Sequence, residues 1–298
     1  MATTYLPPTI EEQPLVRKYA NVLIDRWFKR TFGWAGGRRL MQLLLQEMIP
    51  ERVITDLHFG PQEHINPIRL GKDIRLDVHC TDQDGNHFVV EVQRDDQSTF
   101  YERAVFNSSF VIQSQLPVGR TDWAFSPIYF IGIMNFSFHK GSDEVLFRYN
   151  LKERTSGEPM TDRIEYLFLE IPNCTKALTP EATQLDKICY VFRHISEWDE
   201  RPEGFEGEFF DLLFKSLEIA NFAEDEKSEY LKDMTTERDL ANQMKTAEDR
   251  GRAEGVSKGI EQTRIQTARA MLEDGMPAET VSKYTGLPMQ EIQNLVNR

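Results

Sequence analysis

Three polar side chains stand inside a segment that otherwise alternates between apolar and polar residues. The segment is DIRLDVHCTDQDGNHFVVEVQRDD, residues 73–96, and the three side chains are Asp77, Glu91 and Gln93. Its two alternating runs are typical of β-strands, and the Asp-Gly pair between them indicates a tight turn. The sequence therefore predicts a β-hairpin with one acid on its first strand and an acid plus an amide on its second.

The length of the turn decides which of these side chains share a face, because side chains alternate along a strand. A two-residue turn would put Asp77 and Glu91 on opposite faces. A three-residue turn with Gly85 in the left-handed region pairs Asp82 with Asn86 and puts Asp77 directly opposite Glu91. We prefer this register because it alone gives one apolar face. That face would carry Ile74, Leu76, Val78, Cys80, Phe88, Val90 and Val92, and the polar face would carry Arg75, Asp77, His79, Glu91 and Gln93.

The polar face could bind a metal ion. Two carboxylates opposite each other on antiparallel strands have Cβ atoms roughly 5 Å apart, and they repel each other when both are ionised. A divalent cation between Asp77 and Glu91 would remove that repulsion, and oxygen ligands suit Mg²⁺ or Mn²⁺. Gln93 could orient a water molecule or hold a phosphate oxygen. The alternative is the solvated face of a half-exposed hairpin, and we expect Arg75 and His79 to be supporting or exposed residues rather than ligands.

The charge of the chain is strongly negative but unevenly distributed. The 298 residues carry a formal net charge of -13, and 40% of them are hydrophobic, enough for a substantial core. A globally basic nucleic-acid-binding surface is therefore excluded. Residues 1–50 nevertheless hold seven lysines and arginines against four acids, whereas residues 196–229 hold twelve acids against three bases. A locally basic face remains open as a hypothesis.

The remaining composition favours a reduced, cytoplasmic protein. Cys80, Cys174 and Cys189 are widely spaced and odd in number, so neither a disulfide framework nor a zinc site is indicated. The N-terminal residues lack a basic segment followed by an apolar one, and no apolar run approaches the ~18 residues of a membrane span. We expect neither a signal peptide nor contact with a membrane.

Periodicity and turn residues predict an α/β domain followed by a helical extension. Gly275 and Gly286 are expected to end helices, and Pro277 and Pro288 to lie in first helical turns. Three glycines spaced four apart, Gly251, Gly255 and Gly259, weaken a helix at each position. The predicted helices span residues 14–33, 38–49, 99–116, 181–195, 205–222 and 224–262, with three short ones in 268–296, and the predicted strands span 52–59, 73–93 as the hairpin, 126–138, 144–151 and 162–171.

The hairpin and the segments around it resemble the PD-(D/E)XK nuclease superfamily, and within it the recombination-promoting nuclease (Rpn), or putative transposase, family. The pattern D-x(13)-E-x-Q, followed by a helix that starts FYERA, is similar to the catalytic core of that family. IDRWFKRTFG resembles its first helix, SPIYFIGIMNF its next core strand, and ARAMLEDGMPAETVSKYTGLPMQEIQNL its C-terminal tail. The resemblance implies a mixed central sheet flanked by helices, in the order α-β-β-β-α-β.

The resemblance also implies metal-dependent hydrolysis of DNA phosphodiesters. Asp77, Glu91 and the backbone carbonyl of Val92 would bind Mg²⁺ or Mn²⁺, and Gln93 would stand where the superfamily usually has a lysine. An amide cannot act as a base, so the metal would supply most of the activation of water. Weaker candidates for contact with phosphate or DNA are Arg103, Tyr101, Asn107 and Lys29, with Asp25 in a supporting role. Two of these have simpler interpretations, a salt bridge for Arg103 and an i,i+4 ion pair between Asp25 and Lys29.

The implied organisation is a loose arm over residues 1–13, a nuclease-like domain over 14–222, a charged helical linker over 223–262 and a small helix-turn-helix-like tail over 263–298. Because the tail has few clustered bases, we favour oligomerisation or docking over DNA contact for it. Two other hypotheses stay open for the whole chain. One is a catalytically inactive DNA-binding or interaction protein that keeps the fold, and the other is an acidic scaffold that self-associates through its C-terminal helices.

Overall fold

The computed structural model describes residues 17–60, 63–64, 74–116, 119, 121–174 and 182–296. It divides into two compact units, residues 1–230 and 231–298. The predicted arm over residues 1–13 lies outside the described residues. Among the described residues, no helix is both long and apolar enough to cross a membrane.

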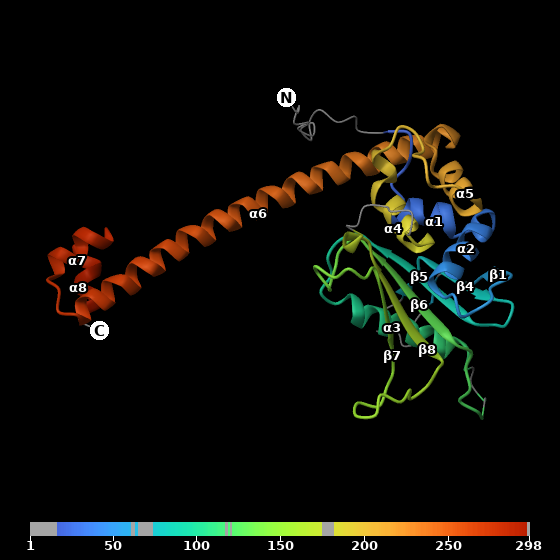
Figure 1. The fold of residues 1–298 in the computed structure, drawn as a ribbon, viewed down its shortest axis with the longest axis horizontal. Helices are drawn as coiled ribbons and strands as arrows, with labels where there is room; N and C mark the ends of the chain where they lie inside the picture. Colours follow the sequence, from blue (N-terminus) through green and yellow to red (C-terminus); the bar gives the residue numbers. More distant parts are fainter. Residues whose placement is uncertain are drawn as a thin grey trace. The chain divides into compact units, whose positions relative to one another are not determined.

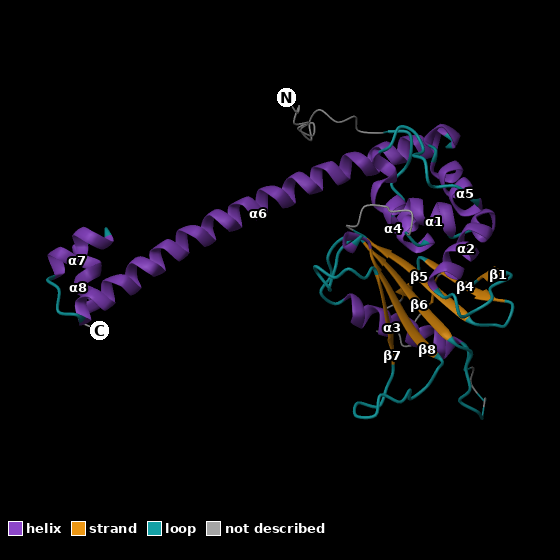
Figure 2. Cartoon of the chain, in the orientation of Figure 1, coloured by secondary structure: helices purple, strands orange, loops and turns teal. Residues whose placement is uncertain are grey.

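The first unit is built on a mixed six-stranded sheet with the strand order β1-β4-β5-β6-β8-β7 (Figure 2). β1, β4 and β5 are antiparallel, β5, β6 and β8 are parallel, and β7 returns antiparallel to β8. A separate two-stranded sheet consists of β2 and β3, which fall between β1 and β4 in the sequence. The strands are β1 Leu57–Phe59, β2 Glu63–His64, β3 Ile74–Arg75, β4 Val78–Asp82, β5 His87–Gln93, β6 Ile128–Met134, β7 Leu146–Asn150 and β8 Ile164–Glu170.

Helices cover both faces of this sheet, as Figure 1 shows. Every residue of β6 is buried, because its two faces meet different layers. Phe130 packs in a cluster with Phe100 and Ala104 of α3, whereas the hydroxyl of Tyr129, on the other face, accepts a 2.6 Å hydrogen bond from Arg52 just after α2. The helices of this unit are α1 Asp25–Phe32, α2 Arg38–Met48, α3 Phe100–Ser114, α4 Gln184–His194, α5 Glu208–Leu217 and the start of α6. The predicted mixed sheet flanked by helices is therefore confirmed.

The first predicted helix is shorter than the sequence pattern suggested. It was expected over residues 14–33, but α1 begins only at Asp25. Lys18 and Ala20 instead exchange backbone hydrogen bonds with the end of α5 and the residues that follow it, and the side chain of Asn21 accepts a bond from the Leu23 amide at 3.0 Å. Tyr19, Val22 and Leu23 are buried as expected, but in extended chain and a turn. Residues 14–16 of the predicted helix lie outside the described residues.

The uneven charge of the chain is neutralised inside the first unit. All seven bases between residues 17 and 39 form ion pairs with acids. Five of the seven bases pair with acids of the segment 196–229, namely Asp199, Glu208, Glu218, Glu226 and Glu229. The hypothesis of a free basic face in this region is therefore wrong, because these charges stabilise contacts within the protein.

The second unit contains most of α6 (Glu224–Glu273), together with α7 (Ala278–Thr285) and α8 (Met289–Val296). α6 runs unbroken through Gly251, Gly255 and Gly259, so no separate short helix begins near residue 268. Gly275 and Gly286 have positive φ angles and end α6 and α7 as predicted. A small core holds the unit together and consists of Ala268, Val281, Leu287 and Ile292.

Candidate active site

The hairpin has the predicted register. Gly85 has φ of 78°, and the amide of Asp82 donates to the carbonyl of Asn86 at 3.1 Å. Val78 pairs with Val90 at the other end of the ladder, so the next opposite positions are Asp77 and Glu91. The turn therefore brings the two acids together, because a one-residue change in its length would move one of them to the other face.

Asp77 lies in a bend between β3 and β4, where the backbone ladder of the hairpin has stopped. Its Oδ2 replaces the missing strand partner by accepting a 3.0 Å hydrogen bond from the Val92 amide. Its Oδ1 lies 2.9 Å from the Nζ of Lys29 on α1. Asp77 is thus held from the hairpin on one side and from the first helix on the other.

The polar face of the hairpin is covered by α3 rather than by solvent. Glu91 is only 3% exposed. Arg103 and Asn107 lie one helical turn apart on α3, so they point the same way. The Nδ2 of Asn107 donates to Glu91 Oε1 at 2.6 Å, and the Nη2 of Arg103 donates to Glu91 Oε2 at 3.0 Å. The alternative of a solvated sheet face is therefore wrong, and His79, expected to be supporting or exposed, is buried as well.

A glycine on the neighbouring strand allows α3 to come this close. Gly132 on β6 lies beside Glu91 in the parallel register. A Cβ atom at this position would be 2.7 Å from a ring carbon of Phe100 and 2.8 Å from Phe168. Because real Cβ atoms do not tolerate such contacts, the absence of a side chain here fixes the distance between α3 and the sheet. That distance lets Arg103 reach Glu91.

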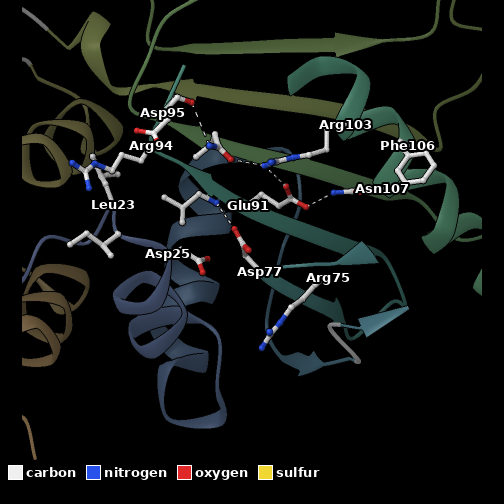
Figure 3. Close-up of a pocket in the computed structure, with 13 residues that line it drawn as sticks. Leu23, Asp25, Arg75, Asp77, Glu91, Arg94, Asp95, Arg103, Phe106 and Asn107 are labelled. Carbon is white, nitrogen blue, oxygen red and sulfur yellow. Dashed lines mark hydrogen bonds and ion pairs between the residues drawn. The ribbon is translucent and has the colours of Figure 1, made fainter. Parts of the chain in front are cut away.

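These side chains open into a cavity of about 430 Å³ (Figure 3). Its walls come from the start of α1, from the end of β5 and from α3. Gln93 contributes an amide whose Oε1 accepts a 2.7 Å hydrogen bond from Arg103, and Arg103 donates further to Gln97 at 3.0 Å. The cavity thus brings together Asp25, Asp77, Glu91, Val92, Gln93, Arg103 and Asn107, with Lys29 behind Asp77.

Two predicted candidates do not line this cavity: Lys29, which contacts its wall through Asp25 and Asp77, and Tyr101. The ring of Tyr101 packs against Phe138 and Phe168, and its hydroxyl lies 3.1 Å from that of Tyr149. It is two residues from Arg103 on α3, which places it on another side of the helix. Sequence reasoning missed five of the lining residues, Leu23, Ile24, Arg94, Asp95 and Phe106. Phe106 precedes Asn107 and follows Arg103 by three positions, so helical spacing could have revealed it.

Burial of the two acids makes their charged forms costly. It raises the pKa of Glu91 to about 7, helped by the charge of Asp77 and opposed by Arg103 and Asn107. Burial also raises the pKa of Asp77 to about 6, helped by the charge of Asp25 and opposed by Lys29 and the Val92 amide. The pKa of Lys29 is lowered by burial, but its hydrogen bonds to Asp25 and Asp77 outweigh this and leave it raised. A cation between the two acids would relieve the cost.

The donor atoms of the cavity fit a hard divalent cation. Within the described ranges, no group of three or more histidines, cysteines or acids is arranged to hold a metal, so the candidate ligands are Asp77, Glu91 and a backbone carbonyl. The Gln93 carbonyl accepts from the Asn135 amide, which follows β6. Successive carbonyls along a strand point in alternate directions, so the Val92 carbonyl points away from β6. It points to the same side as the Val92 amide, which donates to Asp77. Mg²⁺ commonly binds one or two carboxylates and keeps several waters.

The fold and the acid pair together define a nuclease-like protein of the PD-(D/E)XK class. Residues 22–247 match the family model described as "PD-(D/E)XK nuclease family transposase", and the chain belongs to this family. Residues 261–297 match the model described as "Rpn/YhgA-like nuclease family, C-terminal HTH domain". No curated protein and no solved structure matches the chain. The resemblance drawn from the hairpin motif is therefore confirmed.

The two matches support a nuclease-like function, and nucleases of this class generally use divalent metal ions. The tail match confirms the helix-turn-helix resemblance and suggests DNA binding, a function that the sequence had favoured less than docking. The charge of this segment gives a reason for the difference. Few bases stand in residues 263–298, and an electrostatic argument alone undervalues a motif that is defined by its helices.

Proposed function

We propose that the chain is a metal-dependent DNA endonuclease that hydrolyses phosphodiester bonds, in recombination or in the movement of mobile elements as the family's transposase description suggests. The observation that carries this proposal is the acid pair. Asp77 and Glu91 lie opposite each other, both largely buried, in a cavity whose walls also hold Arg103 and Gln93. Burying two carboxylates next to each other without a cation costs free energy of folding. Such a pair therefore indicates a functional site rather than a structural one.

The residues of the cavity would divide the work. Asp77, Glu91 and the Val92 carbonyl would bind Mg²⁺ or Mn²⁺, which when bound lowers the pKa of water and neutralises charge on the phosphate. Asn107 holds the Glu91 carboxylate in one orientation. Gln93 would orient the attacking water or a phosphate oxygen, since its amide can donate and accept but cannot take up a proton.

Arg103 would bind the phosphate with its planar guanidinium group. It donates hydrogen bonds to Glu91, Gln93 and Gln97. A metal ion bound to Glu91 would replace the hydrogen bond from Arg103 and free that N–H group. The released N–H group would then face the substrate, and a guanidinium matches the geometry of phosphate oxygens. As water adds to phosphorus and loses a proton to solvent, the bond from phosphorus to one ester oxygen would break and that oxygen would take up a proton from solvent. The extra negative charge on the phosphoryl oxygens during this step would lie next to the guanidinium group.

Cleavage of supercoiled plasmid tests the proposal. The full chain is incubated with Mg²⁺, Mn²⁺, Ca²⁺ or EDTA, in wild-type form and as Glu91→Gln. We expect cleavage with Mg²⁺ or Mn²⁺, none with EDTA, and a loss of about 100-fold or more in the variant, because weakening even the outer contacts of a metal site costs 10–100-fold. Glu102→Gln is the matched control, since Glu102 is an exposed acid on α3 and its loss should leave cleavage unchanged.

The same experiment addresses the alternative of an inactive DNA-binding protein. Gln93 in place of the superfamily's usual lysine and the net charge of -13 favour that alternative. This alternative would be supported if folded wild-type protein fails to cleave DNA with any of the metals tested, but still binds DNA through its helix-turn-helix tail. Metal-dependent cleavage that disappears in Glu91→Gln would exclude it.

A further inference from the structure

Among the seven bases between residues 17 and 39, Lys29 alone is paired with an acid of the candidate site. The other six pair with acids outside the cavity. The Nζ of Lys29 lies 2.9 Å from Asp77 Oδ1 and 2.8 Å from Asp25 Oδ1. Its ammonium group therefore bridges two carboxylates that come from different elements, as a metal ion would.

The two acids that Lys29 joins both line the cavity, and Figure 3 shows them beside each other. Asp77 is largely buried, with 15% of its side chain exposed, whereas 56% of the Asp25 side chain is exposed. Asp25 also accepts a second contact from Lys29, at 2.9 Å through its other oxygen. Lys29 can therefore leave Asp77 and still keep a partner, one turn away on its own helix.

Arg103 holds the other acid in a different manner. Its guanidinium group is shared among Glu91, Gln93 and Gln97, and it lies over the ring of Phe100 at 4.9 Å. Moving it would break several contacts at once. A lysine has a flexible four-carbon stem and a single charged atom, so Lys29 is the more easily displaced of the two cations.

We propose that Lys29 is a built-in counter-cation that neutralises Asp77 in the metal-free protein and moves over to Asp25 when a divalent ion takes its place. Lys29 and Asp25 then set the metal affinity of the site without being metal ligands. The inference rests on the proposed function, because it assigns Asp77 to the metal. In the metal-bound state the ammonium group stays beside the cavity, where it would add positive charge close to a bound phosphate.

The proposal predicts opposite effects for two neighbouring substitutions. Lys29→Met removes a competing positive charge a few ångströms from the metal, and should tighten Mn²⁺ binding about tenfold or more by Coulomb's law at a partly exposed site. Asp25→Asn removes the alternative partner of Lys29, holds the ammonium on Asp77, and should weaken Mn²⁺ binding by about the same factor. In the double variant Asp25→Asn should weaken Mn²⁺ binding less than it does in the wild-type background, because only the through-space charge of Asp25 then remains and its effect through Lys29 is gone.

The experiment measures Mn²⁺ binding to the full chain by electron paramagnetic resonance without DNA, and plasmid cleavage at saturating Mn²⁺ in parallel. Lys29→Met should bind Mn²⁺ more tightly and yet cleave more slowly, a combination that simple damage to the site does not produce. Lys29→Arg keeps the charge and should stay within about threefold of wild type in affinity. Lys18→Met is the matched control, since Lys18 forms an ion pair with Glu218, which does not line the cavity.

Three outcomes would overturn the inference. The first is Mn²⁺ affinity that is unchanged or weaker in folded Lys29→Met. The second is an Asp25→Asn variant that binds Mn²⁺ as tightly as wild type, which can be scored even if Lys29→Met fails to fold. The third is a loss of affinity on adding Asp25→Asn to Lys29→Met that is at least as large as in the wild-type background, which would show that Asp25 acts directly on the metal. If the wild type binds Mn²⁺ and cleaves, these results reject the role of Lys29 alone, whereas a wild type that does neither rejects the proposed function as well.

Discussion

The buried charge of Glu91 should make the metal-free protein less stable at neutral and alkaline pH. Its pKa rises from 4.5 to about 7 on folding, and one pH unit in a pKa corresponds to about 1.4 kcal/mol. The folded state therefore holds this proton more tightly than the unfolded state. The resulting stability is fully present below about pH 4.5 and is lost as the pH rises through about 7, a loss of about 3 kcal/mol by pH 8.

Replacing Glu91 with glutamine keeps the shape of the side chain and removes its titration. In EDTA at pH 8 we expect Glu91→Gln to be more stable than wild type, which is the reverse of the usual effect of a buried substitution. The gain should be about 1–3 kcal/mol, less than the full cost of the charge because Arg103 loses its ionic partner. The gain should shrink below about pH 5, where Glu91 in the wild type is protonated.

Urea unfolding followed by tryptophan fluorescence is a suitable assay, because all four tryptophans lie in the first unit, at positions 27, 34, 123 and 198. Glu102→Gln again serves as the control. Saturating Mn²⁺ should reverse the order at pH 8 by stabilising the wild type alone. A Glu91→Gln variant that is less stable than wild type in EDTA at pH 8, or a stability difference that does not change between pH 5 and 8, would refute a costly buried charge at Glu91.

Three further substitutions test how the site is positioned. Gly132→Ala should destabilise the first unit by about 1–3 kcal/mol through overpacking against α3, whereas Gly251→Ala inside α6 should be neutral or stabilising; urea unfolding compares them. Asn107→Asp places a carboxylate where Glu91 Oε1 now accepts a 2.6 Å bond, and should move the pH midpoint of Mn²⁺ binding upward by about one unit, because a like charge raises the pKa of Glu91. Arg103→Lys should keep Mn²⁺ binding but lower plasmid cleavage at least about tenfold, because an ammonium group cannot replace the guanidinium fork; equal cleavage would argue against a phosphate contact there.

The hairpin could be predicted from sequence because local rules decide it. Turn chemistry at Gly85 and the alternation of side chains together select one register, and that register places Asp77 opposite Glu91. The order of strands and helices followed in the same way from periodicity. Arg103 and Asn107 were named as candidates, and their i,i+4 spacing explains why both lie on one side of α3.

The predictions that differ from the structure concern features that depend on contacts between segments far apart in the sequence. Residues 18–20 have the apolar spacing of a helix, but the end of α5 offers backbone partners that sequence spacing does not reveal. A solvated hairpin face stayed open as an alternative because nothing local shows that Gly132 allows α3 to cover it. Tyr101 was expected on the same face as Arg103 and Asn107, although two positions on a helix separate its direction from that of Arg103.

The ion pairs between the N-terminal bases and the acidic segment 196–229 affect the rate at which the protein would associate with DNA. With those bases already neutralised, the surface keeps the negative excess of a chain with net charge -13. A DNA backbone would be repelled at long range, so moderate salt should speed the first encounter by shortening that repulsion to about 10 Å at 0.1 M. For most DNA-binding proteins added salt slows this step. In this protein, dissolved ions would reduce the repulsion by DNA phosphates, whereas a basic surface would attract them directly.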